Sequence, residues 1–209
     1  MMINKSPKSR IAQVFAAAAL LSAALGASAQ TGGLLSVGDF ELNAGTFDGD
    51  GRLYLQAGAS LGAWTVGGTG VALVNSAPLA LTGISMDLLG RDGSGSISQT
   101  FMAQAGTTYQ LDWAMGGGSV GAELGVNLGT QTGDYFTARG SRSQQTLQWT
   151  ATTTGLQTVS FARLGGKDDL IVDNVQLNAV SPVPEPESYA LLLAGMGAVG
   201  FVARRRARA

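Results

Sequence analysis

Short alternating segments separated by glycine-rich turns fill the middle of this 209-residue chain. In residues 107–115 every second side chain is large and apolar: Tyr109, Leu111, Trp113 and Met115. Because successive side chains of a strand point to opposite faces, this alternation predicts a half-buried β-strand. The middle of the chain shows no helical period of useful length, so its core has to be built from strands.

Eight further segments carry strand-like patterns, and together the nine predict an all-β fold. Their spacing of about 8 to 15 residues is typical of a jelly-roll β-sandwich. The 31 glycines fit many tight turns, and three tryptophans argue against a disordered low-complexity segment. The candidate strands are 34–41, 71–74, 84–89, 97–101, 107–115, 122–128, 146–150, 158–164 and 170–177.

The first 29 residues have the layout of a secretory signal peptide. A basic start precedes an apolar run from Val14 to Leu25, and Ala27-Ser28-Ala29 supplies the small residues that a signal peptidase reads. The apolar run is too short for a stable membrane span. A buried N-terminal helix is the alternative, but the order of the three parts favours a signal peptide with cleavage before Gln30.

The C-terminal segment consists of a spacer, an apolar stretch and a basic cluster. Pro182, Pro184 and Pro186 hold the chain extended, and the uncharged residues 189–203 end at Arg204-Arg205-Arg206. A helix of this length rises about 22 Å, so it crosses a ~30 Å hydrocarbon core only with local thinning or flanking residues. The arginines would stay cytoplasmic, which agrees with the topology that the signal peptide sets.

This tail resembles the PEP-CTERM sorting signal over residues 181–209. The resemblance rests on the apolar stretch, on the arginines Arg204, Arg205 and Arg206, and on the motif Val183, Pro184, Glu185 and Pro186. It implies a Gram-negative bacterium, cleavage near the Pro-Glu-Pro motif by an exosortase, which is a membrane cysteine protease, and a place among biofilm exopolysaccharide. Glu185 would belong to the recognition sequence. A plain C-terminal anchor is the alternative.

Composition excludes several chemistries from the folded part, residues 30–180. The chain has no Cys and no His, which removes disulfides, thiol chemistry and the usual general base. Residues 30–180 hold six of the 13 basic residues and twelve of the 14 acidic ones. This acidic domain repels nucleic acid and favours cations or neutral partners.

The order of the candidate strands also resembles the choice-of-anchor extracellular domains, which are similar to galactose-binding-like jelly rolls. The family usually has Asn before the first motif's Gly, whereas this chain has Val37, which puts a polar role of that position in doubt. The match covers most of residues 34–178. It rests on GDFE at 38–41, Trp64, GISMDL at 83–88, GSISQTF at 95–101, GTTYQL at 106–111 and LIVDNV at 170–175.

Asp173 is the most informative residue of the folded part. It shares its parity in the last candidate strand with Ile171, Val175 and Leu177. We therefore expect Asp173 to point into the core, where an ionised carboxylate is costly unless it is paired or binds a cation. The jelly-roll resemblance implies a structural calcium ion held by Glu41, Asp173 and backbone carbonyls of residues 37–39. The alternative is a rim Asp that caps a turn or pairs with Arg163.

Sugar binding in proteins commonly uses an exposed aromatic ring beside polar groups. Tyr135 and Phe136 lie in the polar stretch 129–145 and form, with Arg139, the best candidate for such a site. The alternative is a loop that packs its own aromatics onto the edge of the sandwich.

The remaining acidic residues are better explained as surface or turn residues than as catalytic or metal-binding groups. No nucleophile elbow or metalloprotease motif is present, and Asp112 with Glu123 is the nearest pair of carboxylates for a glycosidase, although scattered surface acids explain them better. Asp48-Gly49-Asp50-Gly51 lacks the other ligands of an EF-hand loop and is interpreted as a turn. Asp168-Asp169 is interpreted as a hairpin turn.

These observations predict an exported, exosortase-processed cell-surface or matrix protein whose non-catalytic jelly roll binds polysaccharide. Its partners would be signal peptidase, exosortase, extracellular polysaccharide and, before processing, the membrane. Calcium is the one cofactor expected. The alternatives are a structural matrix protein without a defined ligand and a glycan hydrolase that uses two carboxylates.

Overall fold

The computed structural model describes residues 33–41, 45–75, 80–91, 93–118, 121–137, 140–180, 193–196, 204 and 206. The chain divides into two compact units, residues 1–31 and 32–209, and the β-domain belongs to the second. The predicted signal peptide, the motif residues 183–186 and Arg205 lie outside the described residues. In the part that is described, no helix has both the length and the apolar character needed to cross a membrane.

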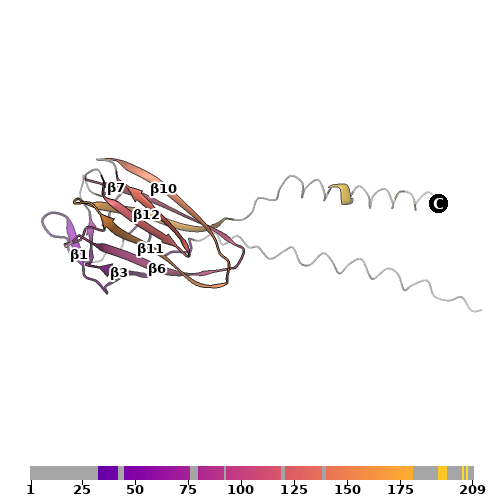
Figure 1. Ribbon diagram of the computed structural model, residues 1–209, viewed down its shortest axis with the longest axis horizontal. Helices are drawn as coiled ribbons and strands as arrows, with labels where there is room; N and C mark the ends of the chain where they lie inside the picture. Colours follow the sequence, from indigo (N-terminus) through magenta and orange to yellow (C-terminus); the bar gives the residue numbers. More distant parts are fainter. Residues whose placement is uncertain are drawn as a thin grey trace, which may run out of the picture. The chain divides into compact units, whose positions relative to one another are not determined.

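The described residues form two six-stranded antiparallel sheets (Figure 1). Sheet A has the order β1-β4-β5-β12-β7-β10, with β1 Arg52–Leu55, β4 Val71–Val74, β5 Ser85–Asp87, β12 Leu170–Val180, β7 Thr108–Gly117 and β10 Arg142–Thr150. Sheet B has the order β2-β3-β6-β11-β8-β9, with β2 Ser60–Leu61, β3 Trp64–Gly68, β6 Gly95–Ala103, β11 Gly155–Gly165, β8 Glu123–Leu128 and β9 Gln131–Phe136.

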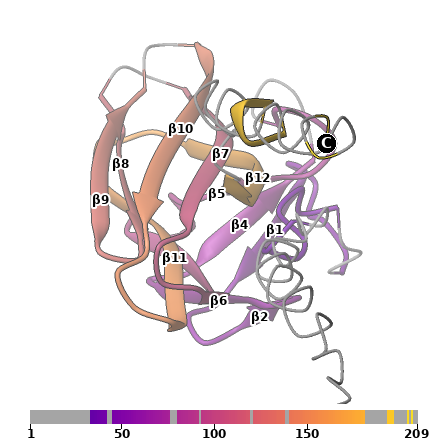
Figure 2. The ribbon, with the colours of Figure 1, turned by 90° about the vertical axis from the view of Figure 1, so that its right-hand side faces the viewer.

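The last eight strands have jelly-roll connectivity, which confirms the predicted fold class. From β5 to β12 the chain changes sheet after every strand except at the β8–β9 hairpin. This gives the antiparallel sets β5-β12-β7-β10 and β6-β11-β8-β9. β1 and β4 extend sheet A, and β2 and β3 extend sheet B. At the opposite margin the edge strands β9 and β10 lie close to each other (Figure 2).

The core lies between the two sheets and contains the apolar side chains that the alternation predicted. Trp113 is fully buried and meets Phe161 edge-on, with ring centroids 5.6 Å apart. Trp149 is also buried; it stacks on Tyr109 and donates a hydrogen bond from its Nε1 to the Thr130 hydroxyl at 3.0 Å. The aromatic residues thus pack between the sheets and set the distance between them.

The prediction of a strand at 34–41 is wrong, although this segment does lie beside β12. It makes isolated backbone hydrogen bonds, from Leu34 N–H to the Leu177 carbonyl and from Val175 N–H to the Gly38 carbonyl. Val37 and Phe40 have φ of 57° and 55°, which interrupts any extended run. A Cβ at Gly38 would overlap the Val175 carbonyl oxygen, so only glycine allows this close approach.

Four strands were missed by the sequence pattern: β1, β2, β3 and β9. β2 and β3 are short and rich in glycine or small residues, so they carry little alternation. β9 is an edge strand with exposed polar residues, and it was read as part of a polar loop at 129–145. Tyr135 is the one large apolar residue on the inward side of β9, so this strand lacks the alternation by which strands are recognised in a sequence.

Candidate functional site

The outward face of sheet A carries a patch of polar side chains that we call the sheet A platform. The alternate residues of β7 and β12 pack into the core, so the residues between them face outward. The register pairs Asp112 with Thr146 and Gln176, and Gln110 with Gln148 and Asn178. The platform consists of Thr108, Gln110, Asp112, Thr146, Gln148, Thr150, Gln176 and Asn178.

Side-chain hydrogen bonds order the platform across two strands. Gln110 Nε2 donates to both carboxylate oxygens of Asp112, at 3.1 and 2.9 Å, and its Oε1 accepts from Gln148 Nε2 at 2.8 Å. Thr146 donates its hydroxyl to Asp112 Oδ1 at 2.6 Å. The hydroxyls of Thr108 and Thr150 lie 2.9 Å apart. The result is a preorganised array of amides and hydroxyls with one carboxylate.

The segment 80–85 forms a wall at the end of the platform. Arg142 donates from its guanidinium to the carbonyls of Leu81 and Ala80, both at 2.9 Å. The floor beneath the wall is built of small residues, and a Cβ at Gly116 would lie 2.9 Å from Leu81 Cδ2. The side chains of Leu81 and Arg142 thereby border two shallow hollows.

These hollows have volumes of about 270 and 260 Å³. The first opens among Gly116, Gly117, Gly118, Gly140, Ser141 and Ile171. The second, among Thr82, Ala114, Ser143, Gln144 and Asn174, adjoins the platform. A ligand lying on the platform can therefore place one end against the wall.

Asp173 lies beneath this wall and not in the core, so the parity argument is wrong. It pairs with Ala114 on the outward side of sheet A, while Val175 and Leu177 face inward, because the register shifts between Asp173 and Gln176. Asn174 at this bulge has φ 50°, a left-handed conformation that Asn tolerates. Parity cannot be extrapolated across such an extra residue.

Asp173 is fully buried and satisfied by hydrogen bonds. Its Oδ2 accepts from Thr82 N–H at 3.2 Å, from the Thr82 hydroxyl at 2.9 Å and from the Ser85 hydroxyl at 2.9 Å; its Oδ1 accepts from Asn174 N–H at 2.7 Å. Burial raises the pKa of Asp173, against the lowering effect of these hydrogen bonds. Arg163 is not its partner, because its guanidinium donates to the carbonyls of Gly93 and Asp168.

Glu41 contacts the same wall segment. Its Oε1 accepts a hydrogen bond from Ile84 N–H at 2.7 Å. Glu41 and Asp173 thus both contact residues 82–85, and carboxylate oxygens are the kind of ligand that calcium prefers. In the described part of the chain no group of three or more Asp, Glu, His or Cys side chains gathers, so a calcium ion would need backbone carbonyls as well.

An ion-pair cluster that the sequence did not reveal lies just beyond the wall, where Asp87 of β5 pairs with Ile171 of β12. Arg52 donates to Asp87 Oδ2 at 2.5 Å and to Asp169 Oδ1 at 2.6 Å. Burial raises the pKa of Asp87 to about 6, against the hydrogen bonds from Leu89 N–H and Arg52. Burial lowers the pKa of Arg52, but the hydrogen bonds to the two carboxylates outweigh this effect. The pKa of Arg52 therefore lies above its ordinary value. The cluster ties β1 to β5 and to the β11–β12 turn.

Tyr135 and Phe136 do not form one aromatic surface. As neighbours on β9 they point to opposite sides: Tyr135 packs edge-on against Trp113 at 4.8 Å, whereas Phe136 is 64% exposed on the outward face of sheet B. Partial burial raises the pKa of Tyr135. Arg139 lies outside the described residues. The two rings are separated because residues 135 and 136 lie in a strand and not in the expected loop, and consecutive side chains of a strand point to opposite faces.

The other acidic candidates fall into three groups. Asp112 and Glu123 lie on outward faces of different sheets, β7 in sheet A and β8 in sheet B, so this pair cannot flank one glycosidic bond. Asp48 Oδ1 accepts from the N–H groups of Asp50 and Arg52, which confirms the turn interpretation. Asp168 and Asp169 do lie in the β11–β12 connection, where Asp169 also pairs with Arg52.

The chain matches the PEP-CTERM protein-sorting motif at residues 182–206, which confirms the resemblance seen in its tail. This motif indicates an exported, cell-surface protein. No curated protein sequence matches the chain.

Several solved structures are similar to the domain. One is TmCBM61 in complex with β-1,4-galactotriose, at 17% identity, TM-score 0.48, and coverage of 71% of this chain and 99% of that one. Another is the CBM22-1 xylan-binding domain of Paenibacillus barcinonensis Xyn10C, at 17% identity, TM-score 0.46, and coverage of 63% and 94%. A third is a family 16 carbohydrate-binding module, at 14% identity, TM-score 0.39, and coverage of 51% and 84%.

Proposed function

We propose that the protein binds a neutral polysaccharide on the sheet A platform, with the wall at residues 80–85 as the end of the site. The observation that carries this proposal is the hydrogen-bonded array of Gln110, Asp112, Thr146 and Gln148. Side-chain amides and hydroxyls both donate and accept, so they complement sugar hydroxyls, which do the same. Their mutual hydrogen bonds hold them in place before a ligand arrives, which lowers the entropy cost of binding.

The charge of the platform favours a neutral ligand over an acidic one. Asp112 is its only charged side chain, and an anionic sugar would meet this carboxylate without a compensating cation on the platform. No aromatic side chain lies among the eight platform residues, so affinity would come from hydrogen bonds to a hydrated chain. Individual contacts of this kind are weak, and we expect dissociation constants near the micromolar to millimolar range, about −4 to −8 kcal/mol.

The test is binding of the purified full-length chain, held in mild detergent, to an array of neutral and acidic polysaccharides. The double variant Gln110→Ala/Gln148→Ala removes two amides from the platform. Because each lost hydrogen bond costs about 0.5–1.5 kcal/mol, affinity should fall about tenfold. Thr100→Ala, on the outward face of sheet B, is the matched control and should leave binding unchanged.

Two outcomes would contradict this assignment. If binding survives the double variant but is lost in Phe136→Ala, the site lies on sheet B and includes the aromatic predicted from the sequence. If the chain binds no polysaccharide on the array, a structural role without a glycan ligand replaces the proposal.

We further propose that the protein is exported by its N-terminal signal and processed by an exosortase at the Pro-Glu-Pro motif. The support is the family match at residues 182–206. In a host with an exosortase, intact mass measurement of the surface-released protein should show loss of the C-terminal segment. Glu185→Ala should leave the segment attached; equal processing of this variant would contradict the proposed recognition role of Glu185.

A further inference from the structure

The outward face of sheet B differs in character from the sheet A platform. On β6 and β11 the inward residues are buried, and the outward residues are small or exposed. A row of small polar side chains crosses all six strands, because the register aligns Ser60, Thr65, Ser98, Ser160, Asn127 and Thr132. Such a surface is flat, since no long side chain rises from its centre.

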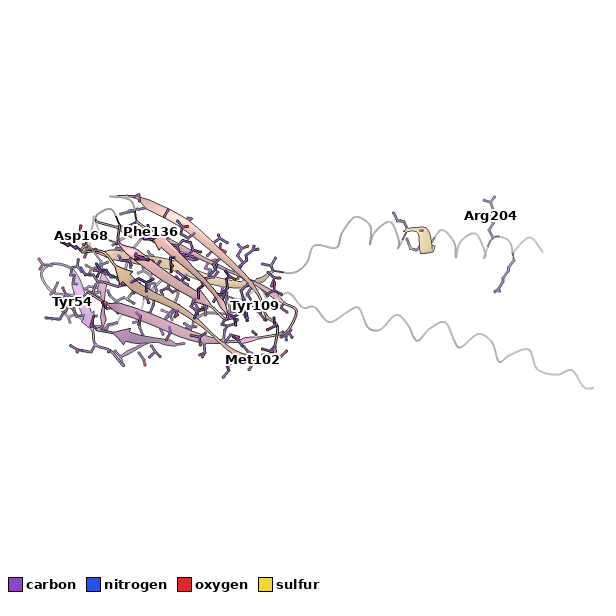
Figure 3. All side chains as sticks on the ribbon, viewed as in Figure 1. Tyr54, Met102, Tyr109, Phe136, Asp168 and Arg204 are labelled. Atoms are coloured by element: carbon purple, nitrogen blue, oxygen red, sulfur yellow. The ribbon has the colours of Figure 1, made fainter. Side chains whose placement is uncertain are left out.

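Exposed apolar side chains stand at the two ends of this flat centre. Leu156 and Met102 face each other across β11 and β6 and are 70% and 58% exposed. Leu164 and Phe136 are 56% and 64% exposed at the other end, and the Leu164 side chain lies over Gly125. Met102 and Phe136 mark these opposite ends (Figure 3).

This distribution is unusual for a solvated face. Among the described residues of the β-domain, the exposed large apolar side chains are these four and Val180, the last residue of β12. The charged residues on the face are Glu123 and Asp134, both near the Phe136 end. Two pairs of exposed apolar side chains on one nearly uncharged face favour a contact surface for protein.

The arrangement along β11 has the symmetry of a surface that can bind a copy of itself. Leu156 precedes Ser160 by four residues and Leu164 follows it by four, which places each leucine about 13 Å from Ser160 along the strand. A two-fold axis through Ser160, in the plane of the face and across the strands, brings Leu156 of one copy over Leu164 of the other. Isologous dimers require such self-complementarity.

We propose that two copies of this chain associate through the outward faces of sheet B, with Ser160 at the two-fold axis. The small residues at the centre let the sheets approach, and the leucines bury their exposed surface at both ends. The strands of sheet B are two to eleven residues long and together give a face of about 600 Å² per copy, or about 1,200 Å² in total, which reaches the lower limit of a stable interface. Both sheet A platforms then face away from the interface.

The test uses the absence of cysteine from the chain, because an introduced thiol is then the only one present. Under mild oxidation, full-length Ser160→Cys should form a disulfide-linked dimer, since each thiol meets its symmetry mate. Thr146→Cys, on the sheet A platform, should remain uncross-linked. A mixture of Leu156→Cys and Leu164→Cys should cross-link faster than Leu156→Cys alone, which tests the antiparallel arrangement.

Sedimentation of the full-length chain supplies the independent measurement. The native chain should be dimeric, and Leu156→Asp/Leu164→Asp should weaken the dimer at least tenfold while its circular dichroism stays that of the native chain, because both side chains are exposed. A monomeric native chain would overturn the proposal. Equal cross-linking of Ser160→Cys and Thr146→Cys would overturn it as well, since association would then arise elsewhere, such as in the apolar tail.

Discussion

Asp173 and Thr82, 91 positions apart in the chain, are joined by two hydrogen bonds to one carboxylate oxygen. Asp173 Oδ2 accepts from the Thr82 N–H at 3.2 Å and from its hydroxyl at 2.9 Å. The same oxygen accepts from Ser85. One buried carboxylate of the last strand therefore fixes the wall segment over the outward face of sheet A.

Loss of this carboxylate should destabilise the fold. Asp173→Ala leaves the Thr82 and Ser85 donors buried without an acceptor, so the free energy of unfolding should fall by about 2–4 kcal/mol in urea denaturation. Asp173→Asn keeps one acceptor oxygen and should cost less. Lys167→Ala, an exposed change in the β11–β12 connection, should stay within about 0.5 kcal/mol. Equal stability of Asp173→Ala and the native chain would mean that the wall is not held by this residue.

The buried Asp87 should make stability depend on pH. Its pKa rises from 3.8 to about 6 in the folded state, so the folded protein binds the proton more tightly than the unfolded chain. Its contribution is therefore fully present below pH 3.8 and is lost as the pH rises to about 6, by roughly 3 kcal/mol in all. Denaturation from pH 3.5 to 7 should show this fall in the native chain relative to Asp87→Asn. A constant difference between the two proteins would contradict it.

Val37→Asn should stabilise the protein. Val37 has φ 57°, where a β-branched residue is strained and where Asn is tolerated. The Val37 carbonyl, which accepts from Trp64 Nε1 at 3.1 Å, is part of the backbone and is kept in the variant. We expect an increase in unfolding free energy of about 1 kcal/mol, seen as a higher thermal midpoint. Val37→Ala should gain less, and a lower midpoint for Val37→Asn would show that the Val37 side chain contributes more by packing.

Calcium binding at Glu41 and Asp173 is a separate proposal. Both carboxylates contact residues 82–85, and the jelly-roll resemblance adds backbone carbonyls of residues 37–39 as ligands. Because an ion bound only by the folded state stabilises it, millimolar calcium should raise the thermal midpoint and a chelator should lower it. Magnesium is the control ion. Glu41→Gln should abolish the shift, and the absence of any shift in the native chain would rule the site out.

The alternation in residues 107–115 predicted β7 and its core face almost to the residue, because its strand is central and buried on one side. β4 and β8 were also predicted within one residue. Two residues of the platform, Gln110 and Asp112, are the polar positions of the same alternation. The platform was not recognised, because an ordinary solvated face carries the same residue types; only the register places Thr146 and Gln148 opposite them.

The sequence by itself determined the sorting signal and the all-β fold class of this protein. Both depend on local properties, namely the terminal motif and the two-residue period of the strands, which neighbouring residues in the chain encode. The tertiary structure decided which face each functional residue occupies. One extra residue at Asn174 moved Asp173 from the expected core to the outward side, and a strand at β9 turned Tyr135 and Phe136 apart. Such outcomes depend on pairing between distant strands, and a period of two reverses completely when a single residue is added.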